Sequence, residues 1–252
     1  MLIDLELLLR SIDLDCGRIY VYWDSGSLLS FEQSISPAEF LKFAEDDLQR
    51  GDKQGLVNAL TNARRAIDSQ IDKVFGCFGL KKPRNFPQKI IILNDMGLIA
   101  PRIINKLSAL RNKLEHEYKL PETEQIEDVV DIANLFVFAL DSILYTFPGQ
   151  FFISTYVKGV KKKNGDFIYD KQILIEFDEN RHEYFLEGYI LDTENLVQDH
   201  NMEFQKTKKE IGQVILGSKD SGYLPLTGIA SKAFRISDLA DDVARLIEPF
   251  TK

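Results

Sequence analysis

The chain contains two kinds of hydrophobic pattern, one with helical spacing and one with strand spacing. Between residues 36 and 147, apolar side chains recur every three or four positions, as at Leu56, Leu60, Ala63 and Ile67. This spacing is typical of amphipathic helices. From residue 150 the period shortens to two, which is typical of strands. The change predicts a helical domain followed by a domain that contains a sheet.

Start and stop signals divide the first of these regions into helices. Ser36-Pro37-Ala38-Glu39 combines an N-cap, a proline at the first helical position and a capping-box glutamate, so a helix is expected from there to about Arg50. Further helices are predicted to end near Cys77, to cover 88–96, to run from Pro101 to about 120, and to run from 123 to 145. These short connections indicate an up-and-down helical bundle over residues 36–148.

The remainder of the chain predicts a smaller α+β domain over 149–252. Strands are expected at 151–157, 173–177 and 184–191, with Asn164-Gly165 as a hairpin turn, and a helix is expected over 237–249. Residues 1–35 fit a short helix and a strand equally well, except that residues 18–23 resemble a strand. This segment could pack against either domain. The expected fold class is therefore a two-domain α+β protein.

Composition narrows the class of protein. The 252 residues are 44% hydrophobic, and 31 Lys and Arg against 39 Asp and Glu give a net charge of -8. This charge argues against a surface that coats nucleic acid or an anionic membrane as a whole, although a local basic site remains compatible with it. Cys16 and Cys77 are too few for a disulfide framework. With no signal-peptide pattern and no long uncharged apolar run, we expect a cytoplasmic protein without membrane contact.

One group of polar residues is suited to chemistry. It is the run Arg111-Asn112-Lys113-Leu114-Glu115-His116-Glu117-Tyr118, at the end of the predicted helix 101–120. Metal-independent RNA cleavage needs a proton-transfer group and a positive charge at the phosphate, and His116 and Arg111 supply these two. On an ideal helix these two side chains lie about 140° apart, whereas Asn112 and His116 share a face. A bent helix end or two facing protomers would bring all three together.

The segment around this run is locally basic. Residues 101–121 contain five basic and two acidic side chains, a net charge of +3. Arg102, Lys106 and Lys113 are therefore candidate contacts to a nucleic-acid phosphate. The alternative is a solvated helical face of mixed charge.

The same run resembles the motif of HEPN (higher eukaryotes and prokaryotes nucleotide-binding) domains, in which Arg is followed after four to six residues by His. The longer form Arg-x4-His-x-Tyr, matched here at Arg111, His116 and Tyr118, is similar to the toxin branch paired with nucleotidyltransferase antitoxins. The resemblance covers about 36–147. It implies a homodimeric, metal-independent endoribonuclease that acts as a toxin or defence effector and leaves a 2′,3′-cyclic phosphate.

The resemblance also implies roles for individual residues. His116 would transfer the proton, Arg111 would neutralise the phosphate, and Asn112 would hold the phosphate or the arginine in place. Tyr118 would contact RNA or be modified by a partner nucleotidyltransferase. No cofactor or metal is expected, because His182 and His200 lack metal-ligand spacing.

Two other functions fit the sequence. One is a non-catalytic HEPN-like dimer that binds nucleotide or RNA or serves as an interaction module, with the C-terminal sheet as its recognition part. The other is a ligand sensor formed by the C-terminal domain, with the bundle as a dimeriser. The basic run Lys161-Lys162-Lys163 could likewise contact RNA or simply keep a hairpin tip soluble.

Overall fold

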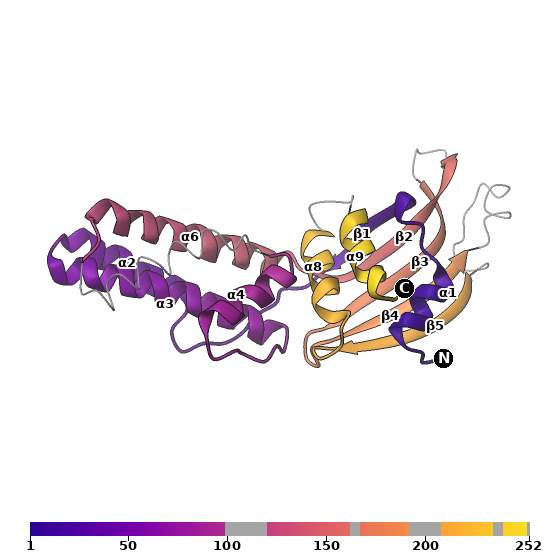
Figure 1. The fold of residues 1–252 in the computed structure, drawn as a ribbon, viewed down its shortest axis with the longest axis horizontal. Coiled ribbons are helices and arrows are strands. Elements are labelled where there is room, and N and C mark those ends of the chain that lie inside the picture. The colour runs from indigo at the N-terminus through magenta and orange to yellow at the C-terminus, as the bar shows by residue number, and fades with distance from the viewer. Residues whose placement is uncertain (99–119, 162–166, 192–207, 234–238, 251–252) are drawn as a thin grey trace. The chain divides into compact units, whose positions relative to one another are not determined.

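The computed structural model describes residues 1–98, 120–161, 167–191, 208–233 and 239–250. Within these ranges the chain is a mixed α+β protein with seven α-helices and five strands. It divides into two compact units, which Figure 1 shows. We call Met1–Leu28 with Thr146–Lys252 the sheet unit, and Leu29–Tyr145 the helical unit.

The sheet unit is built on one antiparallel sheet whose strand order follows the sequence. Its strands are β1 (Ile19–Gly26), β2 (Pro148–Lys161), β3 (Phe167–Asp178), β4 (Glu183–Leu191) and β5 (Lys208–Gly217). β1 and β2 are neighbours although the whole helical unit separates them in the sequence. The two ends of that unit are held together where Gly26 pairs with Pro148 and the Ser27 amide donates to the Phe147 carbonyl over 2.8 Å.

One face of the sheet is covered by α1 (Leu5–Ile12), α8 (Tyr223–Ala233) and α9 (Ala240–Ile247) (Figure 1). The strand residues on this face are buried and in register, as in the row Val21, Ile153 and Ile173. Gly188 continues the row on β4, and a Cβ there would lie 2.4 Å from Ile12 Cδ1 on α1. The glycine therefore allows α1 to pack closely on the sheet.

The short 3₁₀ turns Cys16–Arg18 and Glu248–Phe250 complete the described elements of the sheet unit. The first leads from α1 into β1, and the second follows α9 directly.

The helical unit contains α2 (Pro37–Arg50), α3 (Lys53–Cys77), α4 (Phe86–Asp95) and α6 (Thr123–Tyr145). α2 and α6 both pack on α3, and their apolar stripes form the core. The predicted start of α2 is confirmed: the Glu39 amide donates to Ser36 Oγ over 3.2 Å, and Glu39 Oε2 accepts from the Ser36 amide at 2.8 Å. The bounds predicted for α6 are also confirmed.

A polar link joins α3 to α6 inside this core. Gln70 is fully buried and its side-chain amide donates to Asp141 Oδ1 over 2.9 Å, while Lys73 Nζ lies 2.7 Å from the same oxygen. Polar groups in a core are stable only when paired, so this link favours one register of α6 against α3.

Two elements of the sheet unit have no counterpart in the sequence-based predictions, namely β5 and α8. Residues 1–28, whose place the sequence left open, supply α1 and β1 to the sheet unit. The predicted helix over 101–120 lies almost entirely outside the described residues. Among the helices that are described, none combines the length and apolar character needed to cross a membrane.

We predict that Asp141→Ala lowers the free energy of unfolding of the helical unit by about 2–3 kcal/mol, because it leaves the Gln70 amide and the Lys73 ammonium without their acceptor. Urea unfolding followed by far-UV circular dichroism measures the effect. Asp131→Ala, an exposed carboxylate on the same helix, is the matched control and should cost far less.

The double variant Lys73→Met/Asp141→Leu should recover part of the loss, because no unpaired charge then remains in the core. Equal losses for Asp141→Ala and Asp131→Ala would show that the link does not stabilise the unit.

Candidate functional site

The site residues expected from the sequence lie outside the described residues. Segment 99–119 contains all of them: Arg102, Lys106, Arg111, Asn112, Lys113, His116 and Tyr118. Their place in the chain is between α4 and α6 of the helical unit. The relative positions expected for Arg111, Asn112 and His116 therefore remain a prediction.

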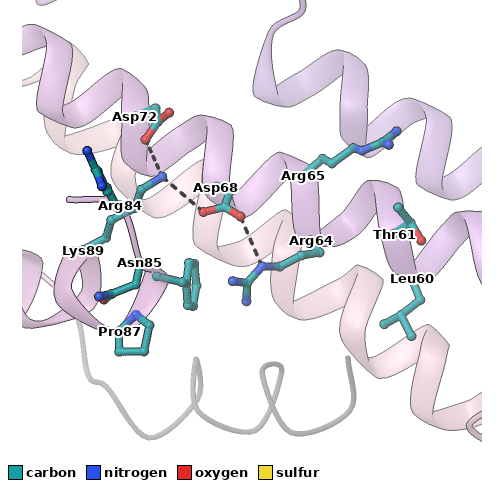
Figure 2. A pocket seen from close by; sticks show the side chains of 11 residues that line it. Leu60, Thr61, Arg64, Arg65, Asp68, Asp72, Arg84, Asn85, Pro87 and Lys89 are labelled. Atoms are coloured by element: carbon teal, nitrogen blue, oxygen red, sulfur yellow. Dashed lines mark hydrogen bonds and ion pairs between the residues drawn. The ribbon is translucent and has the colours of Figure 1, made fainter. Parts of the chain in front are cut away.

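The described part of the helical unit contains a cavity of about 810 Å³ (Figure 2). One wall is a face of α3, whose contributing residues recur at helical spacing: Leu60, Thr61, Arg64, Arg65, Asp68 and Asp72. The other wall comes from the start of α4 and the two residues before it: Arg84, Asn85, Phe86, Pro87 and Lys89. We call this cavity the α3–α4 groove.

Local sequence explains how the second wall is positioned. Asn85 is the N-cap of α4 and its side chain accepts from the Gln88 amide over 3.0 Å, and Pro87 occupies the first turn. An N-cap and a proline at these positions begin a helix at Phe86. Phe86 and Lys89 are consequently placed on one side of the first turn, toward α3.

Ion pairs then connect the two walls. Lys89 Nζ lies 2.7 Å from Asp72 Oδ1 and 3.4 Å from Asp68 Oδ1. Arg64 Nε lies 3.3 Å from the other oxygen of Asp68 (Figure 2). The side chains of Lys89 and Arg64 are only 13% and 16% exposed, so solvent screens these pairs less than pairs at the surface.

Arg64 also makes an aromatic contact across the groove. The central carbon of its guanidinium lies 3.3 Å from the centroid of the Phe86 ring. Such a cation–π contact keeps the guanidinium flat against the ring. Arg64 therefore belongs to both the ion-pair network and the apolar part of the groove.

The groove keeps a surplus of positive charge. Among the lining residues that the structure describes, Arg64, Arg65, Arg84 and Lys89 are cationic, and Asp68 and Asp72 are anionic. Arg84 is exposed and forms no ion pair with any residue that the structure describes, and Arg65 donates only to Asn62 Oδ1 at 3.3 Å within that part of the chain. Figure 2 shows the Arg65 side chain pointing away from Asp68. These two guanidiniums can bind an anion such as a phosphate.

Sequence reasoning missed this groove. The available signal was a pair of arginines on one helix and a basic loop preceding the next. Only the contacts of Lys89 and Phe86 on α4 with Asp68, Asp72 and Arg64 on α3 join these into one surface.

Comparison with known protein families, with curated proteins and with solved structures finds no match to this chain.

Proposed function

We propose that the helical unit is a metal-independent endoribonuclease of the HEPN type. The observation that carries this proposal is the run Arg111, Asn112, His116 and Tyr118, with its toxin-like spacing, in a segment that connects α4 to α6. The positive α3–α4 groove in the same unit supports it, because RNA is a polyanion. Because we propose RNA as the substrate, we also propose that the protein is located in the cytoplasm.

The proposed reaction is an internal transesterification of RNA. A neutral His116 imidazole removes the proton of the 2′-hydroxyl, and the 2′-oxygen forms a bond to the adjacent phosphorus. The bond from phosphorus to the 5′-oxygen breaks, and that oxygen receives a proton from a second, protonated His116. The products are a 2′,3′-cyclic phosphate and a 5′-hydroxyl. Arg111 neutralises the charge on the phosphate oxygens, and Asn112 holds the phosphate.

A homodimer would supply the second histidine. Helix α6 has an exposed surface suited to forming such a dimer. Leu135, Phe138 and Tyr145 are 69%, 74% and 63% exposed and lie three and seven residues apart. This spacing places them on one side of α6. Exposed apolar side chains grouped in this way favour a protein interface, and we assign it to a second copy of the chain.

Control by a partner is part of the proposal. A nucleotidyltransferase-type antitoxin would transfer the nucleotidyl group of a nucleoside triphosphate to the Tyr118 hydroxyl. The tyrosine oxygen would bond to the α-phosphorus as it loses its proton, and pyrophosphate would leave. The product would carry added negative charge beside His116 and block the phosphate site. The chain would then act as a toxin or defence effector.

A non-catalytic HEPN-like dimer that binds nucleotide or RNA, or serves as an interaction module, is the second candidate. The net charge of -8 favours its form as an interaction module, since binding and cleavage of many RNAs both gain from a positive surface. The cleavage experiment below separates the two functions.

We predict that the purified protein cleaves total RNA in the presence of EDTA, and that His116→Ala and Arg111→Ala each abolish cleavage. The proton-transfer group is absent in the first variant and the phosphate charge is not neutralised in the second. Gel analysis and enzymatic detection of 2′,3′-cyclic phosphate ends measure the reaction. His182→Asn, in the turn before β4, is the control and should cleave normally, because asparagine tolerates the positive φ of 54° at that position.

Cleavage retained in His116→Ala would contradict the assignment of the site. RNA binding by the wild-type protein without any cleavage would instead favour the non-catalytic dimer.

We predict that Arg84→Ala weakens RNA binding through the α3–α4 groove. In a His116→Ala background, the plot of log binding constant against log salt concentration should become shallower by about one unit if Arg84 contacts one phosphate. Fluorescence anisotropy of a labelled single-stranded RNA measures this slope. Lys42→Ala changes an exposed lysine on α2 and is the control. An equal change of the salt-dependence slope in the two variants would show that the groove does not contact the RNA.

We predict that Phe138→Glu produces a monomer, because it places a charge in the centre of the exposed face of α6. Light scattering after size-exclusion chromatography measures the mass. Glu127→Gln, elsewhere on the same helix, should leave the dimer intact. A wild-type protein that is monomeric at all concentrations tested would contradict the shared cleft.

A further inference from the structure

The face of the sheet opposite α1, α8 and α9 is not covered by any described helix, and strand register defines which residues lie on it. Three rows cross the strands. The first row is Tyr20, Ser154, Gln172, Tyr189 and Glu210; the second is Tyr22, Phe152, Leu174, Glu187 and Gln213; the third is Gln150, Glu176, Phe185 and Ile215. We call these three rows the open face.

The two sides of the open face differ in chemistry. At β1 and β2 the rings of Tyr22 and Phe152 stack on each other at 4.7 Å, and Tyr22 packs on Tyr169 at 5.6 Å. Beneath them Gln172 is buried and donates to the Tyr22 hydroxyl over 2.5 Å. The ring faces are therefore used in contacts with one another, which leaves the half toward β5 as the part available to a partner.

A depression of about 230 Å³ lies in that half of the open face. Its apolar walls include Leu174, Phe185 and Ile215, and Ile215 is 43% exposed. Glu176 and Glu187 also line it. Pockets that hold drug-sized ligands measure about 300–1,000 Å³, so this depression suits a single large side chain.

Neutral donors hold the two carboxylates in place. Glu187 Oε1 accepts from the Gln213 amide at 2.6 Å and its other oxygen accepts from the Tyr189 hydroxyl. Glu176 accepts from the Gln150 amide. Burial raises the pKa of the Tyr189 hydroxyl above its usual value, and so does the nearby Glu187, so the hydroxyl keeps its proton and remains a donor.

Glu176 and Glu187 have no cationic partner among the described residues, whereas Glu210 pairs with the N-terminal ammonium of Met1 at 3.7 Å. The three rows contain three glutamates and neither lysine nor arginine. Within the described residues, no Lys or Arg nitrogen lies within 4 Å of Glu176 or Glu187. Two oriented carboxylates beside an apolar depression thus lack a cation.

We propose that the open face binds a basic peptide segment of a protein partner, with one lysine or arginine side chain in the depression. The aliphatic part of that side chain packs on Leu174, Phe185 and Ile215, and its charged end pairs with Glu176 and Glu187. Lysine and arginine combine an apolar stem with a cationic head, which matches this order of groups. RNA is disfavoured on this face, because its phosphates would meet carboxylates.

The test uses the full-length protein and an array of nine-residue synthetic peptides that place Lys, Arg, Gln or Glu between varied apolar neighbours. Peptides centred on Lys or Arg should bind, and those centred on Glu should not. For the strongest peptide, the double variant Glu176→Gln/Glu187→Gln should raise Kd by about tenfold or more, since it removes the charge pairing and keeps the side-chain shape.

Glu179→Gln is the control for the general effect of losing a carboxylate, because it removes one negative charge from the exposed turn between β3 and β4. Ile215→Asn tests the apolar wall separately and should also weaken binding, while thermal unfolding confirms that each variant is folded. The proposal is overturned if no basic peptide binds, if Glu-centred peptides bind equally well, or if the control loses as much affinity as the double variant.

Two other occupants give different results. If a second copy of the chain covers the open face, the double variant will have a different oligomeric mass from the wild-type protein, and no basic peptide will bind. If RNA occupies it, RNA affinity will change in the double variant. Either result overturns the proposal, and neither depends on whether the helical unit cleaves RNA.

Discussion

The pairing of β1 with β2 is the interaction on which the organisation of the chain depends. These strands are far apart in the sequence, and between them the chain forms the whole helical unit. Adjacent strands lie about 4.8 Å apart, so the helical unit must begin and end at nearly the same point. The chain meets this constraint where the Leu29 amide donates to the Leu144 carbonyl over 3.2 Å, just inside the unit.

The two units bury their apolar surface in different ways. The helical unit buries amphipathic stripes around α3 and uses the Gln70–Asp141 and Lys73–Asp141 contacts to orient α6. In the sheet unit, by contrast, the described helices all lie on one face of the sheet. An antiparallel sheet is stable with its second face solvated, and this freedom leaves the open face for polar and charged residues.

Charge is divided between the units in a way that the net value of -8 conceals. The α3–α4 groove has more cations than anions, whereas the open face has three carboxylates and no lysine or arginine in its three rows. A polyanion is attracted to the first surface and repelled by the second. The proposed RNA chemistry on the helical unit and the proposed recognition of a basic protein segment on the sheet unit would therefore use surfaces of opposite charge.

The sequence by itself determined the elements whose ends are set locally. The capping box at Ser36 and Glu39 defines the start of α2, and the change of period near residue 150 separates helices from strands. The sequence also contains the motif at Arg111 and His116, because a motif is defined by the spacing of residues along the chain. These features depend on residues within a few positions of one another.

The tertiary structure alone decided the elements that depend on distant partners. α8 is buried on nearly all sides, at Thr227, Gly228 and Ser231 as well as at its apolar residues, so it has no amphipathic period to detect. β5 begins with charged residues and contains Gly212, and it is a strand because β4 pairs with it. The α3–α4 groove likewise exists because Lys89 and Phe86 on α4 contact side chains of α3. In these segments the distant contacts decide the structure and the local pattern carries no clear signal of them, which is why the sequence did not predict them.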